Sequence, residues 1–355
     1  MKKLSILFIF TALLVISSCE KDEDGNGSSA GKVVYITDDI IVPTTWYADS
    51  IYVIKDHDFW VENTLTIQAG TIIKFSPGYY MAVDNDGTII AQGTQEKPIV
   101  FTSLKDDAHG GDVNKDGTAT SPNSGDWKNI SLNSNGNTFT YCQFFYGGGS
   151  SYLSTLEIYK VASIKNCLFV SNKGGKFGDS YYGVLDASEA GNQTVIQSNT
   201  FYNNYLPMSI NPIIKIDNSN VFSNPENQNM KNTMNGIFIN STIDINQSTS
   251  WAETEVPFVI NDIQLIINSP ASLTLANGVI VKFTPYGYLL IDNGASLIFN
   301  SSNFFTSFKD DAHGGDTNGD GSATSPSNGD WDGIYDGKTG KYLSGANILY
   351  DSYKK

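Results

Sequence analysis

Two acidic stretches of the chain have the residue types and spacing of a metal-binding loop. Residues 112–117 read DVNKDG and residues 316–321 read DTNGDG, so both fit Asp-x-Asn-x-Asp-Gly. Short oxygen side chains at alternate positions, followed by Gly, begin the loop with which EF-hands wrap calcium. We therefore predict one Ca2+ in each of two long loops, about residues 105–126 and 309–330. The predicted ligands from the motif are Asp112, Asn114, Asp116, Asp316, Asn318 and Asp320.

The end of each loop departs from the EF-hand pattern. An EF-hand places a bidentate Glu at loop position 12, but these positions hold Asn123 and Ser327. We predict that Asp126 and Asp330, three residues further on, close the two sites. The upstream carboxylates Asp106, Asp107, Asp310 and Asp311 are additional candidate ligands. The alternative is a pair of acidic, Gly-rich turns that bind no metal.

Each loop also carries a Trp and a His. Trp127 and Trp331 follow Gly-Asp, where a ring can either stack on a sugar or plug the base of the loop. We favour the plug and keep ligand stacking as the alternative. His109 and His313 occupy equivalent positions. Because an enzyme rarely needs two copies of its base, we interpret both as structural hydrogen-bonding residues.

The elements that must position these loops are duplicated with them. Residues 101–130 and 305–334 are identical at 22 of 30 positions without a gap, and the similarity extends over about 44–146 and 249–355. Short runs of β-branched and aromatic residues, such as 65–67 and 72–75, alternate with Gly, Pro and Asn turns. Since no stretch has helical periodicity, we predict an all-β fold.

The middle of the chain favours a solenoid. Phe144, Phe169, Phe201 and Phe222 recur at intervals of 25, 32 and 21 residues, with Asn residues around the last three. One coil of a parallel β-helix takes about this many residues and packs on its neighbours. An antiparallel sandwich is the alternative. Cys142 and Cys167 both begin Cys-x-Phe; they either form a disulfide or, as we favour, stack as buried thiols.

The first residues predict an exported chain. Residues 1–18 combine two Lys, an apolar run and two Ser before Cys19, which is typical of a signal peptide. Residues 19–32 are polar, acidic and Gly/Ser-rich, so we expect a flexible tether before a domain at 33–355. The net charge of −15 argues against binding to nucleic acid, and the absence of Arg argues against recognition of nucleotides or uronate polymers.

These features together resemble a known kind of protein. The small residues before Cys19 resemble the lipobox of bacterial lipoproteins, and the acidic tether resembles the surface-export signal of Bacteroidota. The Ile-x-Asn-x-x-Phe coils and the Gly-Asp-Trp loops resemble a right-handed parallel β-helix of the pectate-lyase-like kind. The resemblance implies acylation of Cys19, membrane lipid as a partner, and display on the outer membrane.

The activity is the least constrained part of the prediction. Without Arg, the catalytic Arg of many β-helix lyases has no counterpart, and the motifs of polygalacturonase-type hydrolases are not apparent. We therefore lean towards a protein that is not an enzyme, a calcium-stabilised surface β-helix that acts in adhesion or binds an extracellular glycan or protein. A polysaccharide-degrading lyase or glycoside hydrolase on the same scaffold is the alternative.

Overall fold

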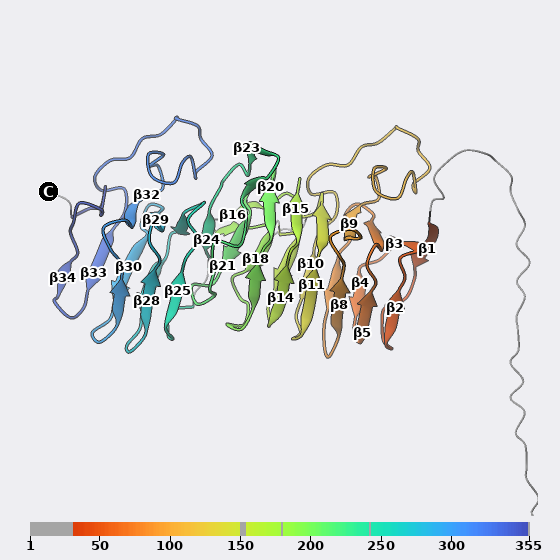
Figure 1. Cartoon of the computed structure of the whole chain (residues 1–355), viewed down its shortest axis with the longest axis horizontal. Coiled ribbons are helices and arrows are strands. Elements are labelled where there is room, and N and C mark those ends of the chain that lie inside the picture. The colour runs from red at the N-terminus through yellow and green to blue at the C-terminus, as the bar shows by residue number, and fades with distance from the viewer. Residues whose placement is uncertain (1–30, 150–153, 179, 241–242, 354–355) are drawn as a thin grey trace, which may run out of the picture. The chain divides into compact units, whose positions relative to one another are not determined.

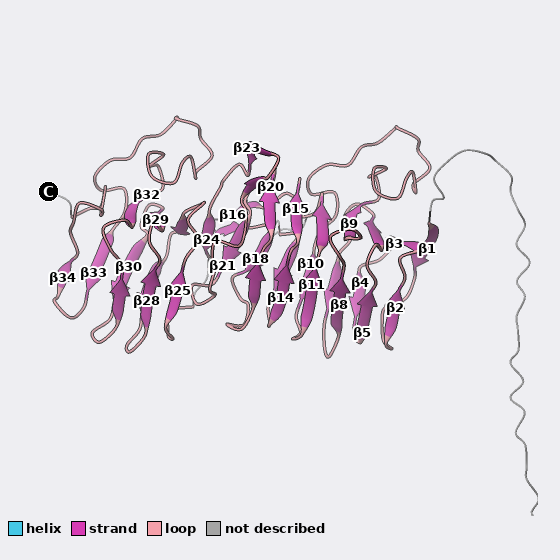
Figure 2. Ribbon diagram, viewed as in Figure 1, coloured by secondary structure: helices cyan, strands magenta, loops and turns pink. Residues whose placement is uncertain are grey.

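The computed structural model describes residues 31–149, 154–178, 180–240 and 243–353. Within these ranges the chain contains strands, turns and loops but no helix. The strands stack into an elongated solenoid in which successive coils extend shared parallel sheets, as Figures 1 and 2 show. The predicted all-β parallel β-helix is therefore confirmed.

One ten-stranded parallel sheet, called here the long sheet, runs through the whole stack. Its strands in spatial order are β4 (Phe59–Val61), β7 (Met81–Val83), β10 (Ile130–Leu132), β13 (Leu156–Ile158), β18 (Leu185–Ala187), β21 (Met208–Ile210), β24 (Ile237–Ile239), β26 (Phe258–Ile260), β29 (Ile280–Phe283) and β32 (Phe304–Ser307).

Two further parallel sheets complete the first part of the solenoid. The seven-stranded sheet contains β1 (Lys32–Ile36), β3 (Ser50–Ile54), β6 (Ile72–Phe75), β9 (Ile99–Ser103), β12 (Cys142–Phe145), β15 (Leu168–Val170) and β20 (Thr200–Tyr202). The six-stranded sheet contains β2 (Thr44–Trp46), β5 (Thr64–Ile67), β8 (Thr88–Gln92), β11 (Asn137–Thr140), β14 (Ala162–Lys165) and β19 (Val195–Gln197).

Smaller sheets complete the second part and form two hairpins. A three-stranded parallel sheet contains β25 (Thr249–Trp251), β28 (Ser272–Leu275) and β31 (Ser296–Ile298). A four-stranded sheet contains β27 (Gln264–Ile267), β30 (Tyr288–Ile291), β33 (Gly333–Asp336) and β34 (Lys341–Tyr342). The antiparallel hairpins are β16 (Gly175–Phe177) with β17 (Ser180–Tyr182), and β22 (Ser223–Asn224) with β23 (Asn227–Lys231).

Alternating residues explain why these segments form coils. In β5, Leu65 and Ile67 are buried while the two Thr between and before them are partly exposed, as expected for a strand with one face on the core. In-register stacking then places like residues above one another. Phe101, Phe144, Phe169, Phe201 and Phe222 form a continuous ladder with ring centroids 4.6 to 5.6 Å apart. This ladder accounts for the recurring Phe in the sequence.

Asparagines lie at the turns between strands, where they bond from coil to coil. The side chains of Asn172, Asn204 and Asn232 bond in series from coil to coil, at 3.2 and 2.9 Å. The left-handed backbone, however, falls on the residue before the ladder position, such as Ser171 or Asn203. At Ser171 and Asn172, positive φ and side-chain bonding therefore fall on two adjacent residues. Asn203 combines them, because its side-chain amide also donates to Ser171 Oγ on the neighbouring coil at 2.9 Å.

Cys142 and Cys167 are free, buried thiols, as favoured from the sequence. Cys142 belongs to β12, and Cys167 directly precedes β15, the next strand of the same sheet. Burial raises the pKa of the Cys142 thiol well above its usual value, so this thiol is unreactive.

The two copies of the duplication use different sheets. The first acidic loop, residues 104–129, leaves β9 in the seven-stranded sheet and enters β10 in the long sheet. The second loop, residues 308–332, leaves β32 in the long sheet and enters β33 in the four-stranded sheet. Both loops nevertheless project along the top edge of the view in Figure 1.

Candidate metal centres in the two acidic loops

A buried lysine supports each acidic loop from below. Lys74 in β6 is fully buried, and its Nζ donates to the carbonyl oxygens of Asp106 and Gly111, both at 2.8 Å. In the second copy, Nζ of the equally buried Lys282 donates to Gly315 O at 2.7 Å and Thr317 Oγ1 at 2.8 Å. These bonds fix the backbone of each loop over the outer face of its sheet.

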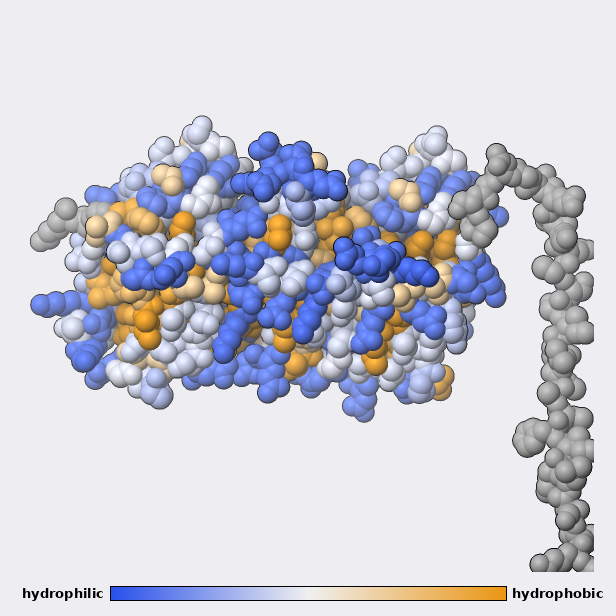
Figure 3. Space-filling view, in the orientation of Figure 1, coloured by the Kyte–Doolittle hydropathy of each residue, from blue (hydrophilic) through white to orange (hydrophobic). Residues whose placement is uncertain are grey.

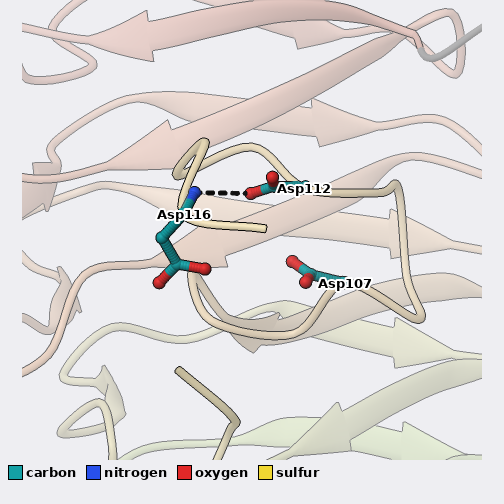
Figure 4. A group of neighbouring side chains, drawn as sticks. All are labelled: Asp107, Asp112 and Asp116. Carbon is teal, nitrogen blue, oxygen red and sulfur yellow. Dashed lines mark hydrogen bonds between the residues drawn. The ribbon is translucent and has the colours of Figure 1, made fainter. Parts of the chain in front are cut away.

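Above each lysine, three carboxylates converge. Oxygen atoms of Asp107, Asp112 and Asp116 lie within 4.8 Å of one another, and those of Asp311, Asp316 and Asp320 do the same. Figure 4 shows the first group, whose carboxylates turn towards a common space. The spacing suits several oxygens around one hard cation.

Several buried oxygens around these groups have no hydrogen-bond donor among the residues that the structure describes. In the first loop they are the Oδ1 atoms of Asp107, Asn114 and Asp116. In the second loop they are the Oδ1 atoms of Asp311 and Asn318. A buried polar atom without a hydrogen-bond partner destabilises the folded state by about 1–3 kcal/mol. Several such atoms in one place therefore indicate a missing binding partner. Acceptor oxygens without donors are what a metal cation would satisfy.

The remaining member of each group organises the backbone. The two oxygens of Asp112 accept the backbone N–H groups of Asp116 and Gly117, at 3.1 and 2.9 Å. Gly117 has a φ of 66°, a left-handed conformation that Gly adopts at no steric cost. Asp316 accepts the equivalent N–H groups of Asp320 and Gly321. The first Asp of each motif therefore shapes the loop as well as facing the cluster.

The electrostatics of the clusters favour a bound positive charge. Burial, followed by the charge of Asp112, raises the pKa of Asp107; burial, followed by the charge of Asp316, raises that of Asp311. A carboxylate whose pKa is raised by like charges is stabilised by any cation that enters the group. The positive charges of Lys74 and Lys282 lower these two pKa values. The hydrogen bonds of the two lysines, however, go to carbonyl and hydroxyl oxygens and not to the carboxylates.

Asp126 and Asp330 do not join the clusters, contrary to the sequence prediction that they close the sites. Asp126 pairs with Lys105 Nζ at 2.9 Å and accepts Ser103 Oγ at 2.8 Å. Asp330 makes the same contacts with Lys309 and Ser307. Both carboxylates pin the end of a loop to the strand before it. The carboxylates that lie with the motif residues are instead those of Asp107 and Asp311, which precede the motif.

Asp106 and Asp310 are also engaged elsewhere. Asp106 Oδ2 lies 2.7 Å from Nδ1 of His109 and accepts Thr102 Oγ1 at 2.5 Å. Burial opposes ionisation, but these hydrogen bonds hold the pKa of Asp106 below its usual value. Asp310 and His313 repeat the contact at 2.7 Å. Each His thus makes the same hydrogen bond to the Asp three residues before it, which fits the structural role expected from the duplication.

The two Trp residues plug the bases of the loops. Trp127 and Trp331 are fully buried and stack on Phe75 and Phe283, with ring centroids 4.3 and 3.9 Å apart. Their indole N–H groups donate to Phe145 O and Leu349 O. Rings enclosed in this way offer no surface to a ligand, so the alternative of ligand stacking is wrong for both residues.

Sequence reasoning missed the two lysines. Each sits in an otherwise apolar strand, in the segments IIKF and IVKF, and a charged residue there is the signal that something covers the outer face of the strand. In Figure 3 the two loops project along the top edge of the view.

Other predictions fall on residues that the structure leaves out. The signal peptide 1–18, Cys19 and all of the tether except residues 31 and 32 lie outside the described residues. In the described part of the chain, no helix is long and apolar enough to cross a membrane.

Comparisons with known proteins support the fold. A family model described as a pectate-lyase-like β-helix domain matches residues 38–142, which include the first acidic loop. The match fits a carbohydrate-related β-helix. No curated protein and no solved structure matches the chain.

Proposed function

We propose that this protein is a lipid-anchored protein of the bacterial cell surface, in which two calcium ions stabilise a β-helix that binds an extracellular glycan or protein. One observation carries the calcium part. Each acidic loop brings oxygens of three carboxylates within 4.8 Å of one another, and buried oxygens beside them have no hydrogen-bond donor in the described part of the chain. Calcium takes six to eight oxygens in flexible geometry, which suits Asp, Asn and carbonyl ligands from one irregular loop.

The proposed role of calcium is to hold the loops in their folded form. Long loops without secondary structure are uncommon unless something orders them. A ligand that binds only the folded state stabilises it by about 2.7 kcal/mol at a hundredfold excess over its Kd. Calcium would therefore act on the loops and, through Lys74 and Lys282, on the sheets that carry them.

Isothermal titration calorimetry tests this proposal directly. The purified protein should take up two calcium ions, Asp112→Ala should take up one, and Asp112→Ala combined with Asp316→Ala should take up none. EDTA should lower the melting temperature of the wild type but hardly change that of the double variant.

A matched control removes a carboxylate outside the loops. Asp86 is exposed and lies in the turn after β7, so Asp86→Ala should leave both the stoichiometry and the EDTA response intact. If the wild type takes up no calcium at millimolar concentration, the calcium proposal fails and the loops are plain acidic turns.

The lipid anchor requires its own experiment. Cys19→Ser should block acylation and release the protein in soluble form, while the wild type partitions into detergent. Accessibility of the wild type to protease on whole cells should then separate surface display from retention inside the envelope. A Cys19→Ser variant that partitions like the wild type would overturn the anchor.

A polysaccharide-degrading enzyme remains the second candidate. It is favoured by Glu157, which lines a pocket and whose pKa is raised to about 7 by burial and by Asp186. A glutamate with such a pKa can act as a general acid near neutral pH. Release of reducing sugar that disappears in Glu157→Gln would support this candidate over simple binding.

A further inference from the structure

The outer face of the long sheet carries a hollow near its first strands. The outward-facing central residues of β4, β7, β10 and β13 are Trp60, Ala82, Ser131 and Glu157, aligned by the strand register. Two small residues between a Trp and a Glu leave a pocket of about 600 Å³ lined by all four. Since strands lie about 4.8 Å apart, the row spans roughly 14 Å from Trp60 to Glu157.

Aromatic and polar side chains form the sides of this pocket. Tyr80 meets Trp60 edge to face, with ring centroids 5.9 Å apart. Lys128 Nζ lies 5.0 Å from the centre of the Tyr80 ring and 3.6 Å from Asp58. Asp84 and Asn133 line the opposite side, where the chain leaves the long sheet. The pocket therefore offers ring surface together with hydrogen-bond donors and acceptors.

Glu157 is the unusual member of this set. It is only 5% exposed, and its Oε1 has no hydrogen-bond partner among the described residues. Asp186 occupies the neighbouring position on β18, where its Oδ1 accepts bonds from Ser188 and Ser209 and its charge helps to raise the pKa of Glu157. A buried acid that lines a pocket with a free oxygen is prepared to bond a polar ligand.

We propose that this pocket, bounded by Trp60, Tyr80 and Glu157, binds a neutral saccharide. A sugar has an apolar C–H face that packs on an aromatic ring, and hydroxyl groups that both donate and accept. Asp84, Glu157 and the protein's net charge of −15 disfavour a phosphorylated or acidic ligand. This inference rests on the glycan-binding part of the proposed function. Lys128 and Asn129, which line the pocket, are the last residues of the first acidic loop, but neither belongs to its carboxylate group.

Tryptophan fluorescence provides a site-specific test. The chain has five Trp, of which Trp46, Trp127, Trp251 and Trp331 are at most 2% exposed. Trp60 is partly exposed, so it should be the main target of the quencher acrylamide. Cellohexaose, xylohexaose, mannohexaose and maltohexaose serve as neutral probes. At least one should protect Trp60 from quenching in a saturable manner.

A matched pair of glutamate variants assigns the effect to the pocket. Burial raises the pKa of both Glu157 and Glu253 to about 7, and Glu253 is also almost fully buried, but it does not line the pocket. Glu157→Gln should weaken protection by about tenfold, as loss of a buried polar contact does at a binding hot spot. Glu253→Gln should leave protection unchanged.

If Glu157→Gln does not fold, Tyr80→Ala replaces it, with the exposed Tyr205→Ala as its control. Failure of all four probes to protect Trp60 at millimolar concentration, or equal weakening by variant and control, overturns the saccharide pocket. Calcium uptake by the loops is measured separately, so loss of one proposal leaves the other standing.

Discussion

The two acidic loops are similar in sequence and carry equivalent groups of three carboxylates, yet the residues that pack beneath them differ. In the first loop, buried Val113 packs with Ile51 and Val53 of β3. In the second, the equivalent Thr317 is fully buried and its hydroxyl accepts a hydrogen bond from Lys282. The first loop is therefore held partly by an apolar contact, and the second by an additional polar one.

A second difference lies at the centre of the motif. Lys115 and Gly319 both have a positive φ, of 59° and 69°. Lys115 is exposed, whereas a Cβ on Gly319 would lie 2.7 Å from the carbonyl oxygen of Thr233. The comparison teaches that the carboxylate geometry is kept while the contacts below and beside the loop adapt to the local coil.

The largest effect is expected from the tryptophans. Trp127→Ala and Trp331→Ala should each cost about 3–5 kcal/mol, because each empties a fully enclosed site. Coils continue on both sides of Trp127, whereas only the last strands follow Trp331. In a solenoid, stability is largely a sum of neighbour contacts. Hydrogen exchange should therefore show fraying confined to the C-terminal coil for Trp331→Ala and broader loss of protection for Trp127→Ala. Equal patterns would contradict this difference.

The buried lysines should differ in their pH response. Burial lowers the pKa of Lys282 from 10.5 to about 8, so the folded state holds fewer protons than the unfolded state between these values. The free energy of unfolding contributed by this group then rises with pH across that window, by up to about 3 kcal/mol. In EDTA, the wild type should gain this amount relative to Lys282→Met between pH 8 and 10.5, as urea titrations would measure.

Lys74→Met is the matched comparison. Burial also lowers the pKa of Lys74, but only Lys282 is brought to about 8, so we expect the same sign and a smaller change. If the difference in free energy of unfolding between the wild type and Lys282→Met stays constant from pH 8 to 10.5, the lysine is better solvated than its burial indicates.

Exchanging the residue types at Val113 and Thr317 tests how much the apolar and the polar contact beneath each loop contribute to stability. Thr317→Val removes an acceptor of a buried ammonium and should cost about 2 kcal/mol. Val113→Thr places a hydroxyl in an apolar patch and should cost about 1 kcal/mol. Chemical denaturation measures both. If Thr317→Val is as stable as the wild type, Lys282 has found another acceptor.

The smallest effects are expected at the motif centre. Gly319→Lys should destabilise the second loop by about 1–2 kcal/mol, because it adds a Cβ at a left-handed position beside the Thr233 carbonyl. Lys115→Gly should change stability by less than about 1 kcal/mol, in the favourable direction. Calcium titration of both variants would show whether the strain reaches the carboxylates. If Gly319→Lys is as stable as the wild type, the segment around Thr233 moves to make room for the side chain.

Much of the fold could be predicted because it depends on local pattern. Alternating residues in β5 and the recurring Phe of the ladder specify strands and coil length directly. The division of the turn between Ser171 and Asn172 could not be predicted, because both residue types favour turns and only the stacked neighbour selects which one bonds. Part of the candidate site could also be predicted from local pattern, because Asp112 and Asp116 lie in one short loop that brings them together.

The sequence by itself determined the duplicated motif and the all-β coils, since both follow from residue type and spacing. Only the tertiary structure decided that Asp107 faces the cluster while Asp126 pairs with Lys105. It also decided that Trp60, Ala82, Ser131 and Glu157, from four different coils, line one pocket. The physical reason is that register between coils is set by packing of the whole stack, and no local spacing in the chain records it.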